Sequence, residues 1–184
     1  MKTEVEARLL ECDVKKLITK LKENNAKFIG DWLQIRKCYD FKPVLPNSWI
    51  RLRTNGKTTT LTIKEIADKS ITGTKECEIV VSDFNTTDEI LNRLGYFARS
   101  HQENRRIQYV LDDVEVDIDL WPKIPPYVEF EAESEDAIKA VTSKLGIEFD
   151  KLTTCDCDEI YKSYGIILSD YPILPLEDEK KREI

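Results

Sequence analysis

The chain has 184 residues, a length that suits one domain with a substantial core, and 34% of its residues are charged. Its formal net charge of -7 argues against general nucleic-acid binding, because phosphate backbones require a cationic surface. No apolar run approaches the roughly 20 residues of a membrane helix, so we expect no contact with a membrane.

The cysteines indicate a compartment. The five of them are odd in number and form no CxxC pair, and the nearest two, Cys155 and Cys157, are too close for a usual zinc knuckle. The N-terminal residues also lack the apolar stretch of a signal peptide. We therefore expect reduced thiols in a cytoplasmic protein, with a zinc or redox site as the less favoured alternative.

The helices expected along the chain are amphipathic, with residues at their ends that cap or stop them. Asp13 can cap a first helix that runs to about Phe28, and Gly30 would stop it. The later helices are expected from residue 86 or 87 to 94, from 134 to 145, and from 156 to 164.

Most of the remaining chain alternates polar and apolar residues with the period of two that indicates strands. The strands are expected at residues 3–10, 49–54, 58–65, 75–81, 105–111, 114–120 and 127–132. Asn55-Gly56 and Asp112-Asp113 predict two turns between neighbouring strands, so the sheet should be mainly antiparallel in an α+β fold. We expect one domain over residues 1–170 and a flexible tail over 171–184.

The polar faces of these strands are almost wholly ionic, beginning with Glu4, Glu6 and Arg8 on the first strand. The later faces carry Arg51 and Arg53, then Lys64, then Glu76 and Glu78, then Glu115, Asp117 and Asp119, and last Glu129 and Glu131. For any one strand, a sheet with one face in water is the simplest interpretation. The strands taken together favour a different interpretation, because acids and bases segregate by strand. If the sheet closes into a barrel, these faces line its interior and must satisfy one another, a metal or a ligand.

A closed barrel of this kind would have a definite chemistry. Converging carboxylates suit Mg²⁺ or Mn²⁺, which accept oxygen ligands and keep waters and phosphate oxygens. Arg51, Arg53 and Lys64 would form a cationic wall on adjacent strands, and guanidinium groups bind pairs of phosphate oxygens. A metal beside such a wall fits a condensed phosphate, and we infer a small-molecule triphosphate as the ligand.

The order of these residues resembles the CYTH superfamily, also called triphosphate tunnel metalloenzymes. The superfamily includes class IV adenylyl cyclases, thiamine triphosphatases, inorganic triphosphatases and fungal-type RNA triphosphatases. Glu4, Glu6 and Arg8 stand in the places of its N-terminal ExExK motif, with arginine in place of lysine. Asp119 precedes a second ExE, Glu129 and Glu131, by about the spacing of the family. The segment 120–127 differs from the glycine-containing turn of the cyclase type.

The resemblance covers about residues 1–165 and implies a closed eight-stranded antiparallel tunnel with a charged interior, flanked by helices. The metal candidates that it implies are Glu4, Glu6, Asp119, Glu129 and Glu131. The substrate-binding candidates are Arg8, Arg51, Arg53, Lys64 and Arg106, and the catalytic candidates are Glu4, Glu6, Arg8 and Lys64. Strand parity sends only one of Arg105 and Arg106 inward.

The resulting hypothesis is metal-dependent hydrolysis of a triphosphate, most simply inorganic tripolyphosphate. One alternative is a class IV-type adenylyl cyclase that converts ATP to cyclic AMP and diphosphate, and another is a polyphosphate-binding module without activity. No GxxxxGK[ST] or GxGxxG motif occurs, so a P-loop or Rossmann site has no support. Whether the chain forms a homodimer stays open at this point.

Overall fold

The computed structural model describes residues 1–181. Its strands are β1 (Lys2–Thr3), β2 (Val5–Leu9), β3 (Lys27–Tyr39), β4 (Ser48–Thr54), β5 (Thr59–Ile66), β6 (Thr74–Val81), β7 (Ala98–Leu111), β8 (Val114–Leu120), β9 (Tyr127–Ala132) and β10 (Ile173–Leu174). Its α-helices are α1 (Val14–Glu23), α2 (Phe84–Arg93), α3 (Glu135–Lys144), α4 (Cys157–Ser163) and α5 (Asp178–Lys181). Two short 3₁₀ helices cover Phe149–Lys151 and Leu168–Asp170.

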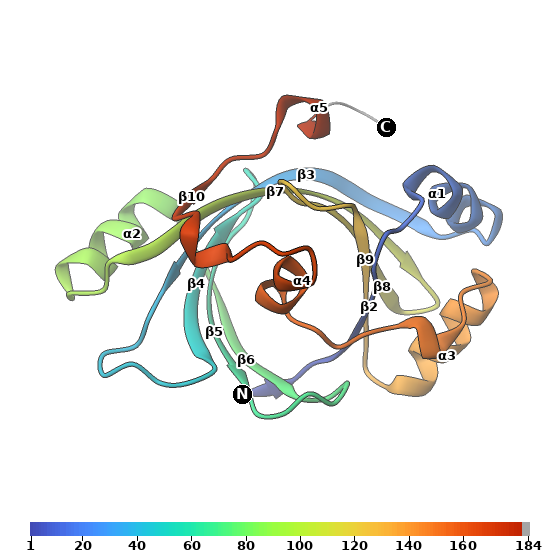
Figure 1. The fold of residues 1–184 in the computed structure, drawn as a ribbon, viewed down its shortest axis with the longest axis horizontal. Helices are drawn as coiled ribbons and strands as arrows, with labels where there is room; N and C mark the ends of the chain where they lie inside the picture. The colour runs from blue at the N-terminus through green and yellow to red at the C-terminus, as the bar shows by residue number, and fades with distance from the viewer. Residues whose placement is uncertain (182–184) are drawn as a thin grey trace.

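The strands form one sheet in the order β1-β6-β5-β4-β3-β7-β8-β9-β2, and every pair along this path is antiparallel. The sheet curls until it is nearly closed into a barrel, as Figure 1 shows. Because β1 and β2 belong to one N-terminal segment, eight chain segments surround the interior within residues 1–181. The expected α+β fold with an antiparallel tunnel is confirmed. The short β10 is an addition that runs parallel to β7.

The N-terminal segment joins the two edges of the sheet. Its first part pairs with β6, where Lys2 lies opposite Glu76, and its second part pairs with β9, where Val5 lies opposite Ala132. Between the two parts, the backbone N–H of Glu4 donates to the carbonyl of Thr74 at 2.9 Å. The segment therefore changes partner at Glu4 and bridges what would otherwise be two free edges.

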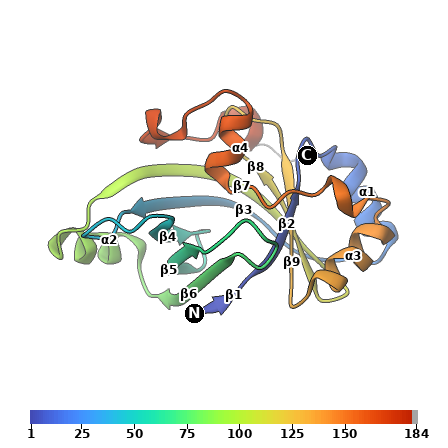
Figure 2. The same ribbon diagram turned by 60° about the horizontal axis from the view of Figure 1, so that its bottom comes forward.

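The apolar faces of the strands point outward and are covered by helices. One core lies between the outer faces of β2, β7, β8 and β9 and the buried sides of α1 and α3, and Leu17, Ile138 and Val141 are among its members. A smaller core packs Leu91 of α2 against Tyr39 and Leu52. Figure 2 shows α2 on one side of the barrel and α1 with α3 on the other. The barrel interior is thus left to the polar faces.

Helix α4 has a different position, because it lies over the centre of the ring of strands in Figure 1. It begins with a capping box in which Asp156 accepts from the N–H of Glu159, and the side chain of Glu159 accepts from the N–H of Asp156. Its buried side chains Ile160 and Tyr161 pack against Trp121 and Tyr127. Helix α4 therefore caps one end of the barrel.

The first helix is shorter than expected, and the strand that follows it was not predicted. The cap at Asp13 is confirmed, but α1 ends at Glu23, and Asn25 adopts a left-handed φ of 59° that turns the chain into β3. The predicted extension of the helix to Phe28 is wrong, because Phe28 and Gly30 pair with β7 as part of a strand of 13 residues. Strand β7 likewise begins at Ala98, seven residues before the expected position.

The other predicted boundaries agree more closely. The strands β8 and β9 have the predicted bounds, and Ser134 caps α3 as expected. Helix α2 begins earlier than predicted, with Asp83 as its cap. Both turn predictions are confirmed, since Gly56 joins β4 to β5 and the left-handed Asp112 and Asp113 join β7 to β8.

The segment expected to be a flexible tail contains ordered elements as far as the structure describes it. Leu174 lies opposite Gln102 of β7, and Leu174 and Leu176 are buried. The packing therefore continues past the domain boundary expected at residue 170, because two leucines of this segment find apolar contacts. Residues 182–184 of the expected tail lie outside the described residues. In residues 1–181, no helix has the length and apolar character needed to cross a membrane.

Candidate active site: a charged tunnel

The interior of the barrel holds a cavity of about 680 Å³. The side chains that line it come from the inward faces of the strands and from α4, as the period of two along each strand requires. Among residues 1–181, its lining includes ten carboxylates and seven basic side chains, so its formal charge is −3. Ligand cavities are lined mainly by apolar side chains, so a lining this highly charged does not fit an ordinary apolar ligand.

Nine of the ten predicted site residues line this cavity: Glu4, Glu6, Arg8, Arg51, Arg53, Lys64, Arg106, Glu129 and Glu131. The tenth, Asp119, is fully buried behind Arg106 and does not line the cavity. Of the two neighbouring arginines of β7, Arg106 points inward, while Arg105 binds Asp31 outside the barrel, with Nε 2.7 Å from Oδ1. The structure therefore gathers residues from four separate parts of the sequence into one site.

Three of the basic residues are held tightly by carboxylates, and Arg106 is the strongest case. Its Nε and Nη2 donate to the two oxygens of Asp119 at 2.8 and 2.6 Å, and Nη2 also reaches Glu129 at 3.2 Å. Its Nη1 donates to Asp117. Burial raises the pKa of Asp117 to about 7 even beside this guanidinium, because Asp119 and Glu129 add negative charge.

Arg8 and Lys64 are the other two. Arg8 Nη2 lies 2.8 Å from Glu6 and 2.5 Å from Glu129, and its Nη1 donates to the carbonyl of Cys155 at 3.1 Å. Burial alone would raise the pKa of Glu129, but Arg8 and Arg106 hold it below its usual range. Lys64 Nζ contacts both oxygens of Glu4 at 3.0 and 2.8 Å.

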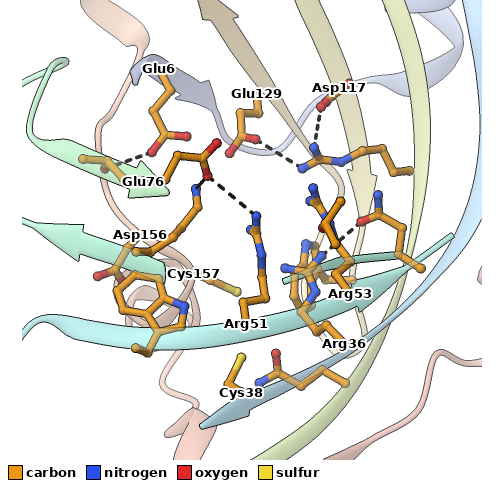
Figure 3. A pocket seen from close by; sticks show the side chains of 18 of the residues that line it. Glu6, Arg36, Cys38, Arg51, Arg53, Glu76, Asp117, Glu129, Asp156 and Cys157 are labelled. Atoms are coloured by element: carbon orange, nitrogen blue, oxygen red, sulfur yellow. Dashed lines mark hydrogen bonds and ion pairs between the residues drawn. The ribbon is translucent and has the colours of Figure 1, made fainter. Parts of the chain in front are cut away.

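A second group of bases has little acid beside it. Arg51 lies 3.5 Å from Glu78 and 3.9 Å from Glu76, and Arg53 lies 3.9 Å from Glu78, which are long ion pairs. The charge of Arg51, then burial, lowers the pKa of Arg53 to about 9. Figure 3 shows Arg51 and Arg53 close to Arg36, with Glu6 and Glu129 across the cavity from them. The carboxylates of the described residues therefore neutralise Arg51 and Arg53 only in part.

The acids include a row of three carboxylates on neighbouring strands, of which Glu6 alone has an ion pair among the described residues. Glu6, Glu131 and Glu115 lie abreast on β2, β9 and β8, where Glu131 is opposite Glu6 on one side and Glu115 on the other. Like charges directly opposite one another destabilise a sheet. Burial, with the negative charges of Glu129, Glu4 and Glu115, raises the pKa of Glu131 to about 8.

This row of carboxylates fits a hard divalent cation by the chemistry of its oxygen donors. Within residues 1–181, however, no three carboxylate, imidazole or thiol groups converge as a ready-made metal site. Glu4 and Glu129 are turned toward Lys64 and Arg8 instead. To bind Glu4 or Glu129, a metal would therefore have to displace Lys64 or Arg8 from the carboxylate. Glu131, in contrast, has no ion pair with a base of the described residues.

The contribution of β3 to the site was not predicted from the sequence. Gln34, Arg36 and Cys38 point from this strand into the cavity, and Trp32 lines it as well. The signal was present, since residues 32–38 alternate between these side chains and Leu33, Ile35 and Lys37. The prediction of a helix up to Phe28 hid it.

The comparisons with known proteins agree with this geometry. A family model described as CYTH domain matches residues 35–163, which is more than half of the chain. Among curated proteins, none matches the sequence. Among solved structures, the PH1012 protein from Pyrococcus horikoshii OT3 superposes with a TM-score of 0.73 at 22% identity, covering 85% of this chain and 98% of that one.

Two further solved structures have the same fold. A protein from Vibrio parahaemolyticus, provisionally described as an adenylate cyclase, has a TM-score of 0.72 at 12% identity and covers 88% of this chain and 98% of its own. A provisional adenylyl cyclase from Hippeastrum, described as having a dominant triphosphatase activity, has a TM-score of 0.61 at 13% identity, with coverages of 90% and 97%. At such identities the likeness concerns the fold.

Proposed function

Because this chain belongs to the CYTH domain family, whose model matches residues 35–163, we propose that it hydrolyses a triphosphate with the help of a divalent cation. The simplest substrate is inorganic tripolyphosphate, which would be cleaved to diphosphate and phosphate. The observation that carries the proposal is the cavity lining, in which poorly paired guanidinium groups face a row of carboxylates.

The electrostatics of the cavity support a metal as part of the substrate complex. With all its acids ionised, the lining has a charge of −3 and would repel a polyanion, although Arg51 and Arg53 attract one locally. A bound Mg²⁺ or Mn²⁺ supplies the missing positive charge and polarises phosphoryl oxygens. Glu4, Glu6 and Glu131 are the residues that we expect to hold it.

The chain's own residues would bind and orient the substrate. Arg51 and Arg53 would each offer two N–H groups to phosphate oxygens, which neutralises charge that develops on the leaving diphosphate. Lys64 lies between Glu4 and Glu76, and we expect its ammonium group to leave one of these carboxylates and bind a phosphoryl oxygen. A carboxylate of the row would orient the attacking water in line with the bond that breaks.

The names of structural neighbours bear on the type of reaction. The Hippeastrum protein combines the same fold with a dominant triphosphatase activity, which supports hydrolysis as the first candidate here. Two neighbours provisionally described as adenylate cyclases, from Vibrio parahaemolyticus and Bacillus halodurans, support cyclisation of ATP as the second. Trp32, which lines the cavity, offers an aromatic surface on which a base could stack.

A screen of substrates and metals tests the proposal. The protein is incubated with tripolyphosphate or ATP, each with Mg²⁺, Mn²⁺ or EDTA, and the products are separated by chromatography. We expect phosphate and diphosphate from tripolyphosphate only when a metal is present. Cyclic AMP from ATP would establish the second candidate, and tight binding without any product would contradict an enzymatic function.

A further inference from the structure

Arg36 is a buried base that is not among the predicted site residues and has no part in the proposed reaction. It lies on β3, lines the cavity and is only 8% exposed. No carboxylate among residues 1–181 lies within ion-pair distance of it, whereas Arg8, Lys64 and Arg106 each have at least two. A buried guanidinium without an acid is costly unless a ligand completes it.

The surroundings of Arg36 fix its position without neutralising it. Its Nη2 donates to Asn104 Oδ1 at 2.6 Å and to Gln34 Oε1 at 3.2 Å. The Asn104 amide in turn donates to Asp119 at 3.0 Å, which links Arg36 to the network that holds Arg106. The Nε atom of Arg36 is buried without a hydrogen-bond partner in the described residues. The Nε donor is thus left without an acceptor on a side chain that its other contacts hold in place.

The flat face of Arg36 is supported from the capped end of the barrel. Its guanidinium carbon lies 4.4 Å from the ring centroid of Trp121, and Tyr161 of α4 meets that ring edge-on, with centroids 6.2 Å apart. Tyr161 itself donates to the carbonyl of Pro122 at 2.8 Å. Such a stack orients the guanidinium, since cations favour the face of an indole.

Arg36 also completes a cluster of three like charges. It lies opposite Arg53 in the pairing of β3 with β4, and Arg51 is the next inward residue on β4, about 7 Å along the strand. Burial and the charge of Arg51 both lower the pKa of Arg36. Three neighbouring guanidinium groups with two long ion pairs to Glu78 between them repel one another until an anion arrives.

We propose that Arg36 binds a phosphoryl group of the substrate, and that Arg36, Arg51 and Arg53 together select a chain of three phosphates over a chain of two. This inference rests on the proposed function. In Figure 3 the three arginines lie across the cavity from Glu6 and Glu129. A diphosphate held on the carboxylate side engages fewer of them, whereas a third phosphoryl group reaches the free edge of Arg36.

Calorimetric titration with tripolyphosphate and with diphosphate, in the presence of Ca²⁺, tests this assignment. The variants are Arg36→Gln and Arg36→Lys, and the matched control is Arg93→Gln on the exposed face of α2, which removes the same charge outside the cavity. We expect Arg36→Gln to weaken tripolyphosphate binding about 10- to 100-fold, as for hydrogen bonds to a charged group, and to weaken diphosphate binding much less. The affinity of Arg36→Lys for tripolyphosphate should lie between those of the unmodified protein and Arg36→Gln, because lysine keeps the charge and lacks the planar guanidinium.

The melting temperature without ligand separates binding from a structural role. Arg36→Gln loses the hydrogen bonds to Asn104 and Gln34 but also removes the repulsion from Arg51 and Arg53, so its melting temperature should stay near that of the unmodified protein. Unchanged affinity for tripolyphosphate would overturn the inference, as would equal losses for both ligands together with a lower melting temperature. A protein that binds tripolyphosphate through Arg36 but never cleaves it would contradict the proposed function alone, and one that does not bind it would contradict both.

Discussion

Replacing Glu131 by glutamine should stabilise the metal-free protein at high pH. Burial and the charges of Glu129, Glu4 and Glu115 raise the pKa of Glu131 from 4.5 to about 8, so the folded state favours the protonated acid. Its ionised form therefore costs stability. The cost is absent below about pH 4.5, grows as the pH rises, and is fully developed above about pH 8.

The size of the effect follows from the shift. The full difference in pKa corresponds to about 5 kcal/mol. Solvent that enters the cavity screens the repulsion between Glu131 and its neighbours, so we expect about 2 kcal/mol at pH values near 9. Glutamine keeps the shape of the side chain and removes its charge, so Glu131→Gln should recover this amount.

The assay is urea unfolding in EDTA at acidic, neutral and alkaline pH. Glu131→Gln should match the unmodified protein at low pH and exceed it increasingly as the pH rises. Glu133→Gln is the control, because Glu133 lies two residues further on with a side chain that is 90% exposed, and its effect should stay within about 0.5 kcal/mol. Added Mg²⁺ should stabilise the unmodified protein more than Glu131→Gln. A variant that is no more stable at alkaline pH would refute the electrostatic reasoning.

Three further predictions concern the same cavity. Glu6→Gln should lose metal-dependent phosphate release while its circular dichroism and melting stay near those of the unmodified protein, and normal turnover would contradict a metal role for Glu6. Arg106→Met should lower the free energy of unfolding by about 3–5 kcal/mol near neutral pH, since Asp117, Asp119 and Glu129 lose their shared base. Urea unfolding measures this loss, which should shrink in acid as these carboxylates become protonated. Chelation by EDTA should stop hydrolysis of tripolyphosphate, and excess Mg²⁺ or Mn²⁺ should restore it, whereas turnover that persists in EDTA would exclude the proposed role of the cation.

The parts of the fold that the sequence predicted are those set by local rules. Strict alternation gave the bounds of β8 and β9, and the caps at Asp13 and Ser134 are side-chain hydrogen bonds within one turn. The start of strand β3 was not predicted, because no glycine or proline separates it from the end of α1. The signal that ends α1 is Asn24-Asn25, where Asn25 takes the left-handed conformation that asparagine tolerates.

The candidate site was predictable in its membership and not in its pairing. Alternation decides which side chains point inward, and the hairpin at Asp112-Asp113 places Arg106 opposite Asp119. Closure of the sheet, in contrast, brings Glu6 beside Glu131. Which acid neutralises which base depends on register and tilt between strands far apart in the sequence, and no local pattern encodes those. For that reason the sequence grouped Arg51 and Arg53 with Arg8 and Lys64, although the structure gives the first two much less acid.

The change of partner at Glu4 has a consequence for the order of assembly. Glu4 and Glu6 belong to the segment that is synthesised early, but its hydrogen bonds go to Thr74, Ile71 and β9. Contacts this distant in sequence form late, because closing a long loop costs entropy before the contacts at its ends can stabilise it. The nascent chain can thus complete neither the barrel nor the carboxylate row until β9 has left the ribosome. An unfinished chain would then expose strand edges without the complete cavity, so the proposed activity would be withheld until β9 (Tyr127–Ala132) has emerged.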